Sequence, residues 1–323
     1  IRASTFGRGI WESPLVIAAQ IAMIISDDKT WGENSFMIQP TDLIIKAGKT
    51  LTVKGNVLMN PDKKIIIKEG GKLIIDGGKI KCSCGTWQGI EVHGDPAKSQ
   101  SPNTNQGYVK IINGGTIENA LIGINAKAHK YAINETTTGF GGGGIIIAEN
   151  AVFKNCQIAV NIDAYKNFIP ANSDVIMPNL CSFNKCTFTT DGVLNDNKNP
   201  EVFVKLMGVH GVKFYGNTFK NNTPNDDMVT KRGIGIKSID AGFMVDQVCT
   251  SGTLPCTSYR QNTFEGLFYG IYDQNISTLN SIIIRNSTFT NNNRGIFISG
   301  AYNSSVTSNI FNVGATEVVN YLA

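Results

Sequence analysis

The sequence predicts an all-β protein, a parallel β-helix in which a single chain winds into roughly ten coils with loop inserts. Three observations predict it: short apolar segments from about residue 42, a spacing that returns about every 22 residues, and few charges. Charged residues are 17% of the chain, and there are 34 glycines. Gly and Asn tolerate the left-handed backbone angles of tight turns, so this composition favours strands joined by many turns.

Residues 1–38 are expected to form an N-terminal helical or capping segment. The apolar stretch 14–25 begins at Ser13 and Pro14, a favourable N-cap and first-turn pair for a helix. A remnant of a signal peptide is the alternative. The stretch is too short to cross a bilayer and contains Gln20, so no membrane span is predicted.

Residues 39–313 are predicted to form the β-helix, and 314–323 a tail or the start of a further segment. Apolar residues there alternate with polar ones, as at Leu51 and Val53. A period of two places one side chain inside and the next outside. A β-sandwich would need antiparallel hairpins at short, even spacing, which this chain lacks.

One skeleton recurs: a bulky apolar residue is followed six positions later by Gly or Ala, and then by Ile or Val. Its copies lie at 117–124, 153–160, 264–271 and 289–298. We expect Phe289 to point inward and to stack on Phe264 and Phe311 of neighbouring coils. Asn291 is expected to hydrogen-bond along the stack at a bend, and Gly295 to allow a second bend.

The spacing between copies varies, which we attribute to polar inserts at one place in each unit. Phe264 and Phe289 are 25 residues apart, and Phe289 and Phe311 are 22 apart. Phe219 and Phe264 are 45 apart, so we expect two coils between them. Units of this length with variable inserts are typical of a solenoid, and function is expected in the inserts.

The segment 48–95, "GKTLTVKGNVLMNPDKKIIIKEGGKLIIDGGKI…GTWQGIEVHGD", resembles the start of β-helix regions in large secreted and surface proteins of Bacteroidota. Its last strand carries Trp87, Gly89 and Ile90 in the pattern of that family. The resemblance covers about residues 30–313 and implies right-handed winding, export of the type IX kind, and display at or release from the cell surface. Residues 1–323 do not include a counterpart of the family's C-terminal sorting domain, as expected of a fragment or a processed form.

The charges and cysteines exclude some classes of protein. The 29 Lys and Arg against 25 Asp and Glu are scattered, so nucleic-acid binding is not expected. Cysteine and histidine spacing does not suit a structural zinc site. Cys249 and Cys256 flank a turn-rich loop that a disulfide would close in an oxidising compartment, and Cys181 with Cys186 is a weaker pair.

A polysaccharide hydrolase or lyase is the alternative function. Polygalacturonase-like hydrolases of this fold use paired carboxylates, which protonate the leaving oxygen and activate water. The segment 222–237 carries Asp226, Asp227 and Lys237. His210 precedes the acids, whereas it follows them in that family, and the Asn-Thr-Asp element is interrupted. We therefore interpret the acid pair as a solvated turn and expect no catalytic residues.

A lyase would need a base beside an acidic calcium cage. The candidate acids are spread along the chain at Asp163, Asp174, Asp240, Asp246 and Asp273. No cofactor is therefore expected, with calcium as the open alternative.

Aromatic residues are the candidate binding residues, because their rings can contact sugars or a partner protein. They are Tyr131, Tyr165, Phe168, Tyr259 and Tyr272.

The predicted function is that of an extracellular or cell-surface rod, structural or adhesive, within a larger protein. It would bind a surface glycan or associate with itself, and a homo-oligomer or fibre joined at open strand edges is a further alternative.

Overall fold

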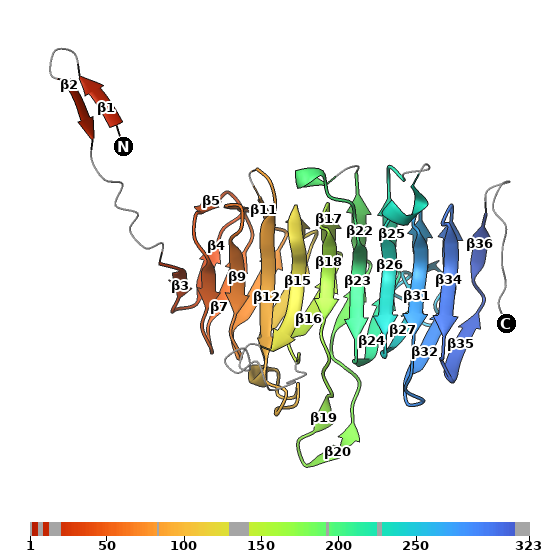
Figure 1. The fold of residues 1–323 in the computed structure, drawn as a ribbon. Helices are drawn as coiled ribbons and strands as arrows, with labels where there is room; N and C mark the ends of the chain where they lie inside the picture. The colour runs from red at the N-terminus through yellow and green to blue at the C-terminus, as the bar shows by residue number, and fades with distance from the viewer. Residues whose placement is uncertain are drawn as a thin grey trace.

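The computed structural model describes residues 2–5, 9–12, 21–82, 84–128, 142–191, 194–224 and 228–313. Most of its strands form three parallel sheets of ten strands each. We call these the first, second and third sheets, in the order in which the chain visits them (Figure 1). Each coil supplies one strand to every sheet, so the described chain makes ten coils. The predicted parallel β-helix is confirmed.

The first sheet runs across the front of Figure 1 and contains β3 (Met23–Ile25), β6 (Leu43–Ile45), β9 (Lys64–Ile67), β12 (Trp87–Gly94), β15 (Ala120–Ala128), β18 (Ile158–Ile162), β23 (Val202–Met207), β26 (Ile234–Ile239), β31 (Tyr269–Gln274) and β34 (Arg294–Ser299). The second contains β4 (Lys29–Trp31), β7 (Thr50–Val53), β10 (Lys72–Asp76), β13 (Tyr108–Ile112), β16 (Ile145–Glu149), β21 (Ser182–Asn184), β24 (His210–Tyr215), β27 (Gly242–Asp246), β32 (Ser281–Arg285) and β35 (Asn303–Thr307). The third contains β5 (Phe36–Gln39), β8 (Asn56–Met59), β11 (Lys79–Cys82), β14 (Thr116–Glu118), β17 (Val152–Lys154), β22 (Thr187–Thr190), β25 (Thr218–Asn221), β30 (Asn262–Glu265), β33 (Ser287–Thr290) and β36 (Ile310–Asn312).

The remaining elements are small. Three antiparallel hairpins are β1–β2 (Arg2–Thr5, Gly9–Glu12), β19–β20 (Phe168–Ile169, Asn172–Ile176) and β28–β29 (Val248–Cys249, Tyr259–Arg260). The 3₁₀ turns are η1 (Asn103–Asn105), η2 (Asn195–Asn197) and η3 (Val229–Lys231). Among the described residues, no helix is long and apolar enough to cross a membrane.

The β-helix begins earlier than predicted, and the helix predicted over 14–25 is wrong at its C-terminal end. Met23 and Ile25 lie in a strand that pairs in parallel with β6. Residues 13–20 lie outside the described residues. Residues 23–25 form a strand despite the local helix signal, because the edge of β6 offers backbone hydrogen bonds and a row of inward side chains on which Met23 and Ile25 can pack.

A stack of phenylalanines fills the interior behind the third sheet. Neighbouring ring centroids along it are 4.6–5.0 Å apart, with interplanar angles of 4–13°. The rings belong to Phe153, Phe188, Phe219, Phe264, Phe289 and Phe311. The inward stacking predicted for Phe289 is thus present.

The prediction of two coils between Phe219 and Phe264 is wrong. Their strands, β25 and β30, are direct neighbours in the third sheet. A single coil holds all 45 residues because it also carries the segment 222–233 and the β28–β29 hairpin. The prediction of inserts at one place is wrong as well, since these two leave the coil at different corners.

The repeated glycine serves ring packing instead of a bend. Gly270 and Gly295 have no left-handed φ. A Cβ on Gly270 would lie 2.7 Å from the ring of Phe289, and one on Gly295 would lie 2.7 Å from the ring of Phe311. The spacing of six residues therefore places a glycine beneath the phenylalanine of the following coil.

The asparagine two positions after the bulky apolar residue makes the bend that was expected. Asn119, Asn155 and Asn291 have φ values of 58°, 53° and 52°. The main-chain N–H of each donates to a carbonyl of the next coil, for example Asn291 to Asn312.

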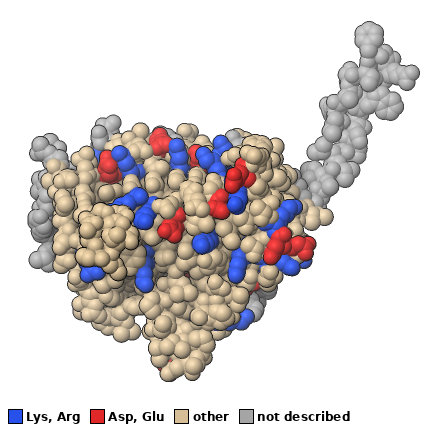
Figure 2. Space-filling view, turned by 180° about the vertical axis from the view of Figure 1, so that it is seen from behind, with Lys and Arg blue, Asp and Glu red and all other residues tan. Residues whose placement is uncertain are grey.

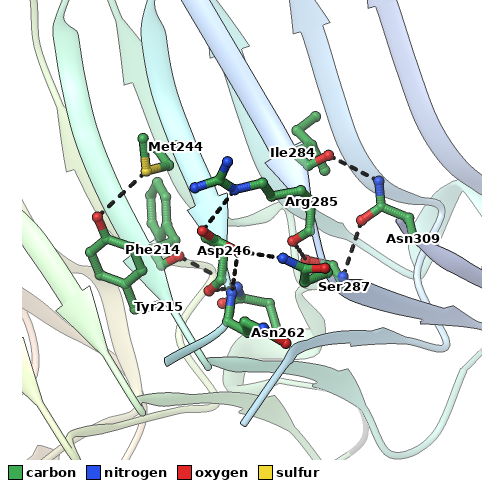
Figure 3. A network of polar contacts seen from close by, with 11 residues as sticks. Phe214, Tyr215, Met244, Asp246, Asn262, Ile284, Arg285, Ser287 and Asn309 are labelled. Atoms are coloured by element: carbon green, nitrogen blue, oxygen red, sulfur yellow. Dashed lines mark hydrogen bonds and ion pairs between the residues drawn. The ribbon is translucent and has the colours of Figure 1, made fainter. Parts of the chain in front are cut away.

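A side-chain ladder lies at another corner, between the second and third sheets (Figure 3). Asn262 Oδ1 accepts the main-chain N–H of Asn217 at 2.7 Å, and Asn262 Nδ2 donates to the carbonyl of Asp246 at 2.6 Å. Asn309 repeats the arrangement by accepting the N–H of Ser287 at 3.1 Å. These bonds satisfy buried backbone groups where the strands stop pairing.

Phe219→Ala should destabilise the protein strongly, by about 3–5 kcal/mol, because the ring is fully buried between two others. Phe311→Ala is the matched control: its ring stacks in the last described coil and is 43% exposed, so a smaller loss is expected. Urea unfolding followed by circular dichroism measures both. Equal losses would show that the interior stack is not a main source of stability.

Gly270→Ala should lower the free energy of unfolding more than Gly295→Ala. At Gly270 the new methyl group would meet both the Phe289 ring and the carbonyl of Gly295, at 2.7 and 2.6 Å. At Gly295 it would meet only the ring of Phe311 this closely, which is partly exposed and can move. If thermal unfolding showed that Gly295→Ala is the more destabilising of the two, that would argue against the interpretation that these glycines make room for the rings.

Candidate functional site

One row of side chains on the outer face of the first sheet changes its chemistry along the rod. Its members are in direct register on neighbouring strands from β12 to β34. They are Glu91, Asn125, Asn161, Lys205, Lys237, Tyr272 and Phe297, and we call them the outward row. The row thus runs from an acid through amides and lysines to aromatic rings.

The carboxylate at the acidic end of the row is fully engaged by neighbouring side chains of the protein. Glu91 accepts hydrogen bonds from Lys64 and Lys127, both at 3.0 Å, and His93 Nε2 lies 3.2 Å from it. Burial raises the pKa of Glu91, but the bonds from His93, Lys64 and Lys127 outweigh it and hold the pKa far below its usual range. This carboxylate is therefore a fixed structural anion.

The middle of the row places two like charges opposite each other. Lys205 of β23 and Lys237 of β26 are register partners, so their strands are about 4.8 Å apart. Neither forms an ion pair with any residue that the structure describes. Like charges in this position destabilise a sheet.

Some other lysines on the strands have acids as neighbours. Lys79 of β11 lies 3.7 Å from Glu118 of the adjacent strand β14, and Lys220 lies 3.1 Å from Glu265 across β25 and β30. Lys205 and Lys237 have no such acid and face each other instead. Such a pair can bind an anion from solution without first breaking an ion pair within the protein.

Aromatic rings continue the row beyond the lysines. The Tyr272 and Phe297 rings stack with centroids 5.0 Å apart, and Lys237 Nζ lies 5.9 Å from the Tyr272 centroid. Tyr269 packs edge-on against Tyr272 at 5.2 Å, and the Arg294 guanidinium lies 5.3 Å above the Tyr269 ring. Tyr269 is buried, whereas the Tyr272 and Phe297 rings are partly exposed and together with the cations form a surface that suits a hydroxylated, acidic ligand.

The structure describes two of the four residues weighed for the alternative catalytic site. Lys237 lies on the first sheet, whereas His210 begins β24 of the second. Asp226 and Asp227 lie outside the described residues, so a catalytic role for them stays untested.

The aromatic residues predicted to bind a ligand lie in different environments. Tyr272 belongs to the outward row, and Phe168 lines a cavity on the second sheet. Tyr165 is 4% exposed and donates from its hydroxyl to the carbonyl of Lys98 at 2.6 Å, so it is a buried structural residue and not a platform. Tyr259 is 52% exposed on the β28–β29 hairpin, and Tyr131 lies outside the described residues.

A disulfide joins Cys249 to Cys256 and closes the β28–β29 hairpin. Cys181 and Cys186, the weaker pair, are separate buried thiols. Burial raises the pKa of each to about 12, so neither is a reactive thiolate.

The scattered acids do not gather into a cage. In the described ranges no three metal-ligating side chains come together. Asp240 accepts the main-chain N–H groups of Ile276 and Ser277, and Asp246 accepts from Arg285 at 2.8 Å and from Asn286 at 2.9 Å (Figure 3). Both are engaged in shaping corners of the coil.

Sequence reasoning missed Lys205, Phe297 and Arg294. Their partners lie one coil away, and the number of residues in a coil changes with every insert. The one available signal was the constant offset from the recurring skeleton, which places Tyr272 and Phe297 at the same position after Phe264 and Phe289.

Comparison with known proteins finds no match: no family model, no curated protein and no solved structure corresponds to this chain.

Asp273 is an ionisable group inside the solenoid. It is 0% exposed, and Asn275 Nδ2 donates to its Oδ2 at 2.8 Å. Burial raises its pKa to about 6, although hydrogen bonds from Ser238 and Asn275 oppose the rise. The folded protein therefore binds this proton more tightly than the unfolded chain does, and stability falls as pH rises from about 4 to 6.

Asp273→Asn should remove the loss of stability that the wild type shows as the pH rises from about 4 to 6. Relative to the wild type, the variant should gain up to about 3 kcal/mol above pH 6 and gain nothing near pH 4. Asp246→Asn is the control of opposite sign, because it breaks the ion pair to Arg285 and should destabilise at neutral pH. Thermal unfolding across pH 4–8 measures both, and a pH-independent effect of Asp273→Asn would contradict the assignment.

Proposed function

We propose that this chain is an extracellular adhesive rod that binds an acidic polysaccharide along the outward row of its first sheet. Support comes from the fold, whose ten coils make a stiff scaffold about 45 Å long. The Cys249–Cys256 disulfide is typical of a protein outside the reducing cytosol.

The Lys205–Lys237 pair carries the proposal. Two lysines on adjacent strands, neither in an ion pair with a described residue, concentrate positive charge that a bound anion would offset. An acidic sugar supplies that anion, and its hydroxyl oxygens can contact the electropositive edges of Tyr272 and Phe297.

A polysaccharide fits better than a single sugar because the row is periodic. Successive members are about 4.8 Å apart along the axis, so binding groups recur in a straight line over several coils. Solenoids commonly use such extended surfaces for binding. A hydrolase or lyase function depends on Asp226 and Asp227, and no described geometry favours it.

Binding of polygalacturonate, measured by calorimetry, tests the proposal. The wild type should bind it in a salt-dependent way, and the Lys205→Ala/Lys237→Ala double variant should lose about tenfold in affinity, or 1.4 kcal/mol. Lys220→Ala is the matched control, since it removes a lysine of the third sheet, and it should bind as the wild type does.

Two outcomes would contradict the proposal. One is equal affinity of the double variant and the wild type. The other is equal binding of neutral dextran and polygalacturonate, which would leave the two lysines without a role. Release of shortened sugars during the assay would favour an enzyme instead.

A further inference from the structure

A cavity of about 780 Å³ lies over the outer face of the second sheet, beside the β19–β20 hairpin. Three parts of the chain form its walls: the loop that holds Ser99 and Ser101, the segment 167–180, and strands β21 and β24. Its volume is within the range of about 300–1,000 Å³ that small-molecule sites occupy. The outward row is on another sheet, so this would be a separate site.

The walls are tied together by buried hydrogen bonds. Gln100 is 0% exposed; its main-chain N–H donates to Asn167 Oδ1 at 3.0 Å, and its Oε1 accepts the N–H of Leu180 at 2.8 Å. The hydroxyl of Tyr165 joins the same region to Lys98. The loop and the hairpin therefore hold the cavity open as a preformed space.

One wall of the cavity is apolar. Phe168, Met177, Pro178 and Leu180 line it, and between Asn167 and Leu180 the chain has one charged residue, Asp174. Figure 2 shows the same trait from behind, where the projection at the lower edge carries few charged side chains. An apolar part of a ligand would be buried here.

Polar side chains that line the cavity offer hydrogen-bond donors. Asn179 is 3% exposed, and its Oδ1 accepts from Gln100 Nε2 at 3.4 Å and from the N–H of Cys181 at 2.9 Å. These bonds fix the orientation of the amide, so its Nδ2 is the atom left without a partner within the described chain. Lys213, on β24, also lines the cavity and forms no ion pair with a described residue.

A buried donor without an acceptor destabilises the protein, because it has given up its hydrogen bond to water and gained none in return. A ligand with an acceptor group would restore a hydrogen bond there, and a carboxylate would also pair with the Lys213 ammonium. The Asn184 side chain also lines the cavity, with an Oδ1 that lacks a described partner. Rotation of that amide can present its NH₂ group as a third donor.

We propose that this cavity binds a small amphipathic carboxylate. Its apolar body lies against Phe168 and Met177, and its carboxylate accepts from Asn179 Nδ2 and Lys213 Nζ. The apolar body can be an alkyl chain or an aromatic ring, and the probes below separate these two sources. The proposal does not depend on the glycan-binding function.

Calorimetric titration of the full chain with decanoate and with 4-phenylbutyrate, below micelle-forming concentrations, tests it. At least one should bind saturably at one site, and decanol, which lacks the charge, should bind at least tenfold more weakly. Decanoate alone would identify an alkyl ligand, and 4-phenylbutyrate alone an aromatic one.

Three variants locate the site. Lys213→Ala should weaken carboxylate binding at least fivefold and leave decanol unchanged. Asn179→Asp keeps both acceptor bonds but replaces the free donor with an anion, so it should weaken binding further. Met177→Trp should fill the cavity and abolish binding.

Lys110→Ala, which removes a lysine of the same sheet outside the cavity, is the control and should bind normally. Circular dichroism establishes that each variant is folded. Absence of saturable binding, equal affinity for decanol and decanoate, or normal binding by Met177→Trp would each overturn the proposal.

Discussion

Stacking of one phenylalanine ring on the next, behind the third sheet, sets the register on which the rest of this protein depends. The ring spacing of 4.6–5.0 Å equals the distance between neighbouring strands. A slip of one residue would turn each ring to the solvent side, so the stack penalises such a slip. The glycine that follows six positions later, as at Gly270, leaves room for the ring of the next coil.

Once the register is fixed, the outward positions are free to vary. Inward partners of the first sheet stay apolar over most of its length, whereas the outward row passes from Glu91 to Lys205 and on to Phe297. The scaffold thus converts distant sequence positions into neighbours about 4.8 Å apart. The binding surface that we propose belongs to the strands themselves, and the cavity beside β19–β20 belongs to an insert.

The sequence predicted the architecture because the constraint behind it is periodic. The inward stacking of Phe264, Phe289 and Phe311 followed from spacing alone. The role of Gly295 did not, because a glycine that allows a bend and one that makes room for a ring look alike in a sequence. The pairing of Lys205 with Lys237 was equally hidden, since it depends on the length of the segment between β25 and β26. The strand at residues 23–25 was not predicted, because the favourable helix start at Ser13 and Pro14 led us to extend a helix through it.

Lysine footprinting of the wild-type chain, with and without bound polygalacturonate, tests whether the outward row of the first sheet is the binding surface. Acetylation rates at each lysine are compared by mass spectrometry. We expect Lys205 and Lys237 to lose reactivity together, while Lys213 on the second sheet and Lys220 on the third keep theirs. Uniform protection of all lysines, or protection of Lys213 and Lys220 with Lys205 and Lys237 unchanged, would contradict it.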